Sequence, residues 1–231
     1  MTDPTASRPA RPGVLFDVDG TLVDSTYLHV VAWWQAFRDH GVTVPARDLH
    51  RRIGQGAPRL VKETLGRDDE AVVEAHTQRF EPFLSEVTAL PGAVDLLRAC
   101  AGRGLTVVLA TSAGATEVGS QREALAGAAE AISVVTSSED AEESKPDPDI
   151  LLTALRGADL RAEDCVFVGD TVWDVAAAAE AGMACIGLLV GGIGESELRA
   201  AGAVEVYDDP RALLTAFDDS PLGRLTGPAG G

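Results

Sequence analysis

Two aspartates, Asp17 and Asp19, follow a short apolar run at residues 14–16 and come just before Gly20. Side chains two positions apart in an extended chain point to the same side, so these carboxylates repel one another. Burying such a pair is costly unless a cation or a shared proton accompanies it. The alternative is an ordinary loop in which the aspartates accept backbone hydrogen bonds. The pair is therefore a candidate cation site.

A second acidic pair, Asp170 and Asp174, follows another apolar run at residues 165–168. If a helix begins near Thr171, Asp170 could simply be its N-cap, and Asp174 would share its face one turn later. In a sheet of parallel strands, these carboxylates can also converge with the loop that carries Asp17. A set of oxygen ligands without histidine or thiolate favours Mg²⁺.

Hydroxyl and lysine side chains stand at two further positions. Thr111 and Ser112 end the apolar run 107–110, where a turn or helix cap is an equally good interpretation for Ser112. Lys145 precedes Pro146 and Pro148, which delay the next helix until after the lysine. A surface lysine there would be ordinary, but the chain has only two lysines. That scarcity makes Lys145 a candidate for binding an anion.

Short apolar strands alternate with helical patterns along most of the chain. Strands are expected at residues 14–16, 105–110, 132–136, 165–169, 184–189 and 203–207, and helices between them include 92–101, 147–155 and 172–181. This alternation predicts an α/β fold, a doubly wound and mostly parallel sheet with helices on both faces.

One segment, residues 25–90, interrupts the alternation. Its patterns are helical, at residues 27–40, 46–52, 58–65 and 68–86. An insert placed directly after the first strand would lie above the carboxyl ends of the strands, where open α/β sheets bind ligands. We therefore expect a disordered tail at 1–12, a core of 13–24 and 91–218, a helical cap at 25–90 and a flexible tail at 219–231.

Composition excludes several classes of protein. A net charge of −17 argues against a nucleic-acid partner, and no apolar run is long enough for a membrane span. The start of the chain lacks the apolar core of a secretory signal. Cys100, Cys165 and Cys185 are widely spaced and odd in number, which predicts buried thiols in a reducing cytoplasm. We expect a monomer or homodimer.

The acidic and basic candidates together resemble four motifs of the haloacid-dehalogenase-like hydrolase superfamily. Residues 17–21 resemble its DxDGT motif, Thr111 its hydroxyl position, Lys145 with Pro146 its third motif and residues 169–174 its GDxxxD motif. Their order and spacing match over roughly residues 13–217. The resemblance implies a Rossmann-like core and a phosphatase in which Asp17 is the nucleophile.

The same resemblance implies roles for the other residues. Asp19 would protonate the leaving oxygen and then activate water, with proximity to Asp17 keeping Asp19 protonated. Thr111 would bind a phosphate oxygen, and Lys145 would pair with Asp17 and the phosphate. Mg²⁺ would be held by Asp17 and Asp170, the backbone oxygen of Asp19, and Asp174 directly or through water.

The insert is similar to the small helical cap of the phosphoglycolate-phosphatase and β-phosphoglucomutase branch. That resemblance implies a small phosphorylated metabolite, phosphoglycolate-like or sugar-phosphate-like, as substrate. Its expected contacts are Ser112, His29, Arg52, Gly54 and Gln55. For His29, packing at the domain hinge is at least as good an interpretation.

Two rival functions stay open. A sugar-phosphate mutase would use the same chemistry at Asp17 but return the phosphate to sugar; Lys62 is the only lysine in the insert that could assist. A non-enzymatic phosphate-binding module is the other rival, because a fold does not dictate a function. A module of that kind would be expected to have at least one broken motif.

Overall fold

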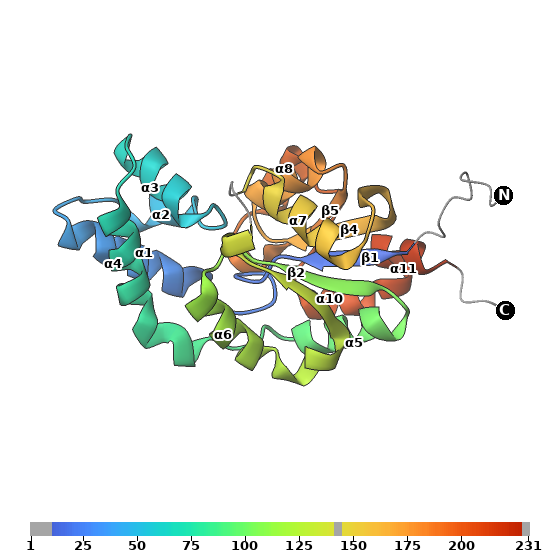
Figure 1. Ribbon diagram of the computed structural model, residues 1–231. Helices are drawn as coiled ribbons and strands as arrows, with labels where there is room; N and C mark the ends of the chain where they lie inside the picture. The colour runs from blue at the N-terminus through green and yellow to red at the C-terminus, as the bar shows by residue number, and fades with distance from the viewer. Residues whose placement is uncertain (1–10, 141–144, 228–231) are drawn as a thin grey trace, which may run out of the picture.

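The computed structural model of the chain describes residues 11–140 and 145–227. Its centre is a six-stranded sheet in the order β3-β2-β1-β4-β5-β6, and every neighbouring pair is parallel (Figure 1). The expected doubly wound α/β fold is confirmed. The strands are β1 Gly13–Phe16, β2 Thr106–Ala110, β3 Ile132–Thr136, β4 Cys165–Gly169, β5 Ala184–Leu188 and β6 Glu205–Tyr207.

Helices cover both faces because successive strand residues point to opposite sides. Val14 and Phe16 join one apolar cluster, and Leu15 between them joins the other. Side chains from α5 Ala93–Gly102, α10 Pro210–Thr215 and α11 Pro221–Thr226 pack in the first cluster. Those from α7 Asp149–Ala158, α8 Val172–Glu180 and α9 Glu195–Ala201 pack in the second.

The strand order places a topological switch beside β1. From β1 the chain builds one half of the sheet through β2 and β3, then crosses back to build the other half from β4 outward. Ligands of open α/β sheets bind outside the carboxyl ends of the strands at such a switch. Asp17 is the first residue after β1, and its backbone N–H donates to the Val168 carbonyl of β4 at 2.9 Å.

Four helices form a separate small unit at one end of the sheet (Figure 1). They are α1 Thr26–Asp39, α2 Ala46–His50, α3 Ala57–Leu65 and α4 Glu70–Phe80, followed by a 3₁₀ turn at Glu81–Glu86. Trp33, Phe37, Leu49, Leu60 and Val72 are buried together in a core of their own. We call this unit the cap. Helix α6, Ala115–Ala124, follows β2 on the core side.

The end of the chain differs from the expectation. Residues 221–226 form a helix, its N-cap hydroxyl Ser220 accepts from the Leu222 N–H at 3.2 Å, and Leu222 is fully buried. The expected flexible tail is therefore wrong for residues 219–227. One turn of helix with few apolar residues is too short to show a periodic pattern. Residues 1–10 and 228–231, where the tails were also expected, lie outside the described residues.

Two simpler expectations concern cysteines and membranes. All three cysteines are buried free thiols, as expected. Among the described helices, none has the length and apolar character that crossing a membrane requires.

Candidate active site

Asp17 and Lys145 form the centre of the site. Lys145 is fully buried, and its Nζ lies 2.5 Å from Asp17 Oδ1 and 2.8 Å from Asp174 Oδ1. A buried ammonium is tolerated only when carboxylates compensate for the lost hydration. Lys145 therefore fixes the relative positions of two strand ends, after β1 and after β4.

The acidic residues after those strands converge as expected. One carboxylate oxygen from each of Asp17, Asp170 and Asp174 lies within 4.8 Å of the others. Asp170 Oδ1 accepts from the Thr21 hydroxyl at 2.7 Å, while its Oδ2 is buried and has no hydrogen-bond partner in the described structure. Burial, followed by the charges of Asp174 and Asp17, raises the pKa of Asp170 well above its ordinary value. Such an oxygen cluster fits a hard divalent cation.

Two glycines pack closely against Asp170 of this cluster. A Cβ on Gly191 would come within 1.7 Å of Asp170 Oδ2, and one on Gly20 would come within 2.7 Å. Only hydrogen-sized substituents therefore fit against the unpartnered oxygen. The glycine backbone therefore packs directly against the buried carboxylate of Asp170.

Asp174 also takes part in capping a helix, which the sequence pattern did not indicate. Its Oδ2 accepts from the Thr171 N–H at 3.0 Å and the Thr171 hydroxyl at 2.7 Å, which completes a capping box at the start of α8. The alternative in which Asp170 is the N-cap is wrong. With Asp174 already engaged by Thr171 and Lys145, Asp17 and Asp170 offer the most available oxygens.

Asp19 is surrounded by donors. Its Oδ1 accepts from Ser25 Oγ at 2.6 Å and lies 3.4 Å from His29 Nε2. Its Oδ2 accepts from Gln121 Nε2 at 2.6 Å and from Thr111 Oγ1 at 3.4 Å. Sequence reasoning missed Gln121, because a glutamine in the middle of a helix carries no motif. In the structure, Gln121 is the one buried residue of α6.

The protein shifts the pKa values of Asp17 and Asp19 in opposite directions. Burial raises the pKa of Asp17 to about 7, against the lowering effect of Lys145. Burial also acts on Asp19, but hydrogen bonds from His29, Ser25 and Gln121 outweigh it and lower the pKa of Asp19. The expectation that proximity keeps Asp19 protonated is therefore wrong. These three donors stabilise its ionised form more than burial destabilises it.

His29 fits both expectations for it, as a residue of the site and as a residue packed at the domain hinge. It touches Asp19, and its ring also stacks on Phe80 at a centroid distance of 3.9 Å. Its Nδ1 lies 3.3 Å from His76 Nε2 on α4. Burial, followed by the charge of His29, holds the pKa of His76 well below its ordinary value. His29 thus links the site to the buried interior of the cap.

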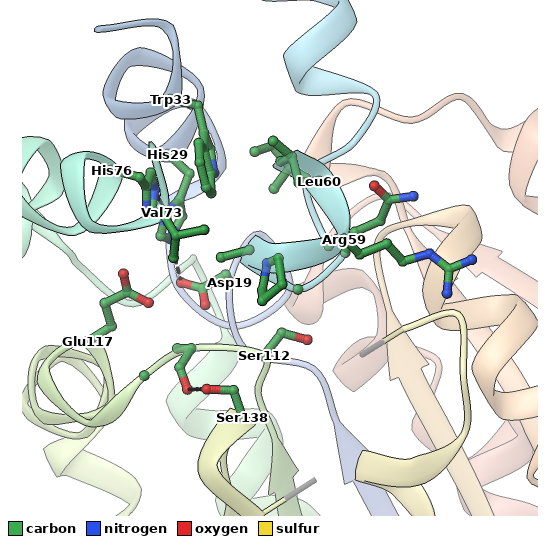
Figure 2. A pocket seen from close by; sticks show the side chains of 18 of the residues that line it. Asp19, His29, Trp33, Arg59, Leu60, Val73, His76, Ser112, Glu117 and Ser138 are labelled. Atoms are coloured by element: carbon green, nitrogen blue, oxygen red, sulfur yellow. Dashed lines mark hydrogen bonds and ion pairs between the residues drawn. The ribbon is translucent and has the colours of Figure 1, made fainter. Parts of the chain in front are cut away.

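A cavity of about 790 Å³ lies between cap and core, and Figure 2 shows the side chains that surround it. Asp17 and Asp19 form part of its wall. Of the expected substrate contacts, four line it: Ser112, His29, Gly54 and Gln55. The Ser112 hydroxyl is buried and has no hydrogen-bond partner in the described structure.

Arg52 and Thr111 are placed differently. Arg52 is absent from the cavity wall, and its guanidinium bonds Glu63 at 2.6 Å. Thr111 is fully buried beneath the wall, against Asp19. Arg59, one turn into the next helix, lines the cavity instead and bonds Asp147 at 2.5 Å. Which arginine faces inward depends on how the cap docks, which local sequence does not determine.

Several contacts hold the cap against the core. His50 Nε2 lies 2.8 Å from the Gly191 carbonyl oxygen, and Arg51 Nη1 donates to Glu197 at 2.6 Å. Trp173 Nε1 donates to the Arg51 carbonyl at 3.2 Å. These contacts join α2 and the residue after it to the core around α8 and α9.

Comparisons with known proteins show which family and fold this chain shares. A model of the haloacid dehalogenase-like hydrolase family matches residues 12–182. Phosphoglycolate phosphatase of Rhodospirillum rubrum is 30% identical over 214 residues, 87% of this chain and 88% of that one. Hexitol phosphatase A of Escherichia coli is 33% identical over 174 residues, 74% and 79% of the two chains. The crystal structure of a hydrolase from Pseudomonas syringae has a TM-score of 0.85 at 33% identity, covering 90% of this chain and 98% of that one.

Proposed function

Because the chain belongs to the haloacid dehalogenase-like hydrolases and is a phosphatase, we propose that it hydrolyses a small phosphorylated metabolite through an aspartyl-phosphate on Asp17. One observation carries the proposal: Asp17, at the switch of the sheet, is bound to buried Lys145 beside two further clustered carboxylates. An acidic nucleophile can approach a phosphate dianion only where positive charge offsets their repulsion.

The carboxylate cluster supports Mg²⁺ as the cofactor. Asp17 and Asp170 would hold it with the backbone oxygen of Asp19, and Asp174 would assist directly or through water. Their oxygens are the hard ligands that this ion prefers. When bound, the ion neutralises charge on the phosphoryl group and on Asp17.

In the first step, a carboxylate oxygen of Asp17 forms a bond to phosphorus as the ester P–O bond breaks. The leaving oxygen takes a proton from Asp19. Asp19 starts with a lowered pKa, so it must take up a proton from solvent when the substrate binds. The incoming dianion raises the pKa of Asp19 by like-charge repulsion, which favours that uptake.

In the second step, Asp19 accepts a proton from water as the water oxygen bonds to phosphorus. The bond between phosphorus and Asp17 breaks, which releases inorganic phosphate and restores the carboxylate. Ser25, His29 and Gln121 hold Asp19 ionised and in place for this step. The Ser112 hydroxyl is free to donate to a phosphate oxygen, and the cap excludes bulk water.

Phosphate release from p-nitrophenyl phosphate tests the proposal. We expect turnover with Mg²⁺, none with EDTA and none for Asp17→Asn. Mass spectrometry of the Asp19→Asn variant after incubation with substrate should detect one added phosphoryl group on the peptide that carries Asp17. Turnover in EDTA or in Asp17→Asn would overturn the mechanism. Isomerisation of a sugar phosphate without net phosphate release would favour the mutase instead.

A further inference from the structure

Glu117 lies in the cavity wall away from the carboxylate cluster. It belongs to the first turn of α6, four residues before Gln121, so both side chains share one face of the helix. Glu117 is half-buried and lines the cavity. Figure 2 shows its carboxylate extending from α6 toward α4, which carries Val73 and His76. The reaction proposed above does not use Glu117.

Among the described residues, no lysine or arginine neutralises this carboxylate by direct contact. Within residues 11–140 and 145–227, no ion pair joins Glu117 to a lysine or arginine; its carboxylate accepts the backbone N–H of Gly114. Burial raises the pKa of Glu117, and the charge of His29 opposes that effect only in part. An acceptor that is half-buried and lacks an ion pair favours a ligand that donates hydrogen bonds.

The fixed cations of the cavity wall are already engaged. Arg59 bonds Glu63 at 3.2 Å and Asp147 at 2.5 Å. Lys62, which is 64% exposed at the mouth, lies 3.7 Å from Asp68. The wall contains five carboxylates but only these two lysine or arginine side chains. A second acidic group on a substrate would therefore meet excess negative charge beyond the phosphate site.

The size of the cavity adds a second constraint. About 790 Å³ is within the usual range for a site that encloses a ligand of drug-like size. A two-carbon ester would fill a small part of that volume, and water would occupy the rest. The volume therefore favours a leaving group of several carbons.

From these contacts we propose that the leaving group is a polyol or amino-polyol without a second acid, and that Glu117 accepts hydrogen bonds from its hydroxyl or ammonium groups. The proposal rests on the proposed function, which places the phosphate at Asp17. It makes Glu117 a specificity-determining residue that attracts donors and rejects carboxylates by like charge.

A matched pair of substrates tests this selectivity. Sorbitol 6-phosphate and 6-phosphogluconate have the same carbon chain and differ at the far end, where one has a hydroxymethyl group and the other a carboxylate. We expect kcat/KM of the wild-type protein to favour the polyol by about 100-fold, because like charges in contact are strongly unfavourable. Glu117→Gln keeps the length and the acceptor to Gly114 but removes the charge, and should reduce the preference about tenfold.

Glu123→Gln is the matched control, because Glu123 is exposed on the same helix. It should leave the ratio of the two kcat/KM values unchanged. Equal kcat/KM for the two esters in the wild-type protein, or an unchanged ratio in Glu117→Gln, would overturn the inference.

Binding separates this inference from the proposed function. Calorimetry of both esters with the Asp17→Asn variant measures the preference without turnover. Tighter binding of sorbitol 6-phosphate supports the role of Glu117 even if no phosphate is ever released by the wild-type protein. Equal affinities overturn it even if the wild-type protein is an active phosphatase.

Discussion

Gly54 of the cap lies directly against Thr171 of the core: a Cβ on Gly54 would come within 2.8 Å of Thr171 Oγ1 and 2.9 Å of its Cγ2. Thr171 caps α8 and bonds Asp174, so this contact joins the cap to the carboxylate cluster. Gly54 also has a φ of +95°, a backbone conformation that side chains disfavour. The absence of a side chain here lets the cap close.

Replacing Gly54 with alanine should hold the cap away from the core. We expect kcat/KM to fall by about 10- to 100-fold, since small misplacements of a site cost that much. Gly41→Ala is the control, because Gly41 has a φ of +74° but no neighbour within 4 Å of a built Cβ. It should lose stability by about 1 kcal/mol through backbone strain and keep its activity. Equal kinetics for the two variants would contradict the steric explanation.

Replacing Lys145 with methionine should damage stability as well as activity. The change leaves Asp17 and Asp174 buried without their shared cation. Breaking a buried ion pair from one side costs about 3–5 kcal/mol, measured here by denaturant unfolding without added metal. Lys62→Met, at an exposed pair, should change stability by less than about 0.5 kcal/mol. Similar losses of unfolding free energy in the two variants would show that Lys145 does not stabilise the buried carboxylates.

The Asp170→Asn variant should distinguish the charge repulsion at Asp170 from the role of Asp170 in metal binding. Without added metal, we expect this variant to unfold at a higher temperature than the wild-type protein, because burial and the charges of Asp174 and Asp17 disfavour an ionised Asp170. Mg²⁺ at 100 times its dissociation constant should stabilise the wild-type protein by about 2.7 kcal/mol and the variant far less. Equal stabilisation of both by Mg²⁺ in thermal unfolding would remove Asp170 from the metal site.

Gln121→Met should change the pH dependence of turnover. Gln121 donates to Asp19 and helps to lower the pKa of Asp19, so losing the bond raises that pKa. The ionised base is then lost at a higher pH, and the acidic limb of the kcat profile moves upward in pH. Gln78→Met removes an exposed glutamine of the cap and should leave the profile in place. An unmoved acidic limb in Gln121→Met would show that Gln121 does not hold Asp19.

The parallel sheet and the motif residues could be predicted because their signals are local. The strands β1, β2 and β4 are short and largely apolar, and Asp17, Thr111 and Asp170 each follow one of them directly. Parallel strands end at the same edge of the sheet, so residues at those ends must converge. The doubly wound topology followed from the handedness of the connections, whereas the order of the strands came from the structure.

Only the tertiary structure decided which side chains surround those residues. Gln121 reaches Asp19 across 102 positions of the chain, and Lys145 reaches Asp17 across 128. Lys145 belonged to a motif and could be expected, whereas Gln121 had no local signal. The raised pKa of Asp17 and the lowered pKa of Asp19 depend on burial and on hydrogen-bond donors from several elements. The spacing of motifs along the sequence does not encode these surroundings.

The cap shows most clearly which features the sequence predicts and which only the tertiary structure decides. Its helices could be expected from their patterns, but only the tertiary structure placed Arg59 in the cavity wall and left Arg52 outside it. It also placed Glu117, an unremarked helix residue, opposite α4. The sequence alone determined the reaction centre, because that chemistry lies at strand ends. The tertiary structure decided the environment of the leaving group, because that environment is formed where the surfaces of the cap and the core meet.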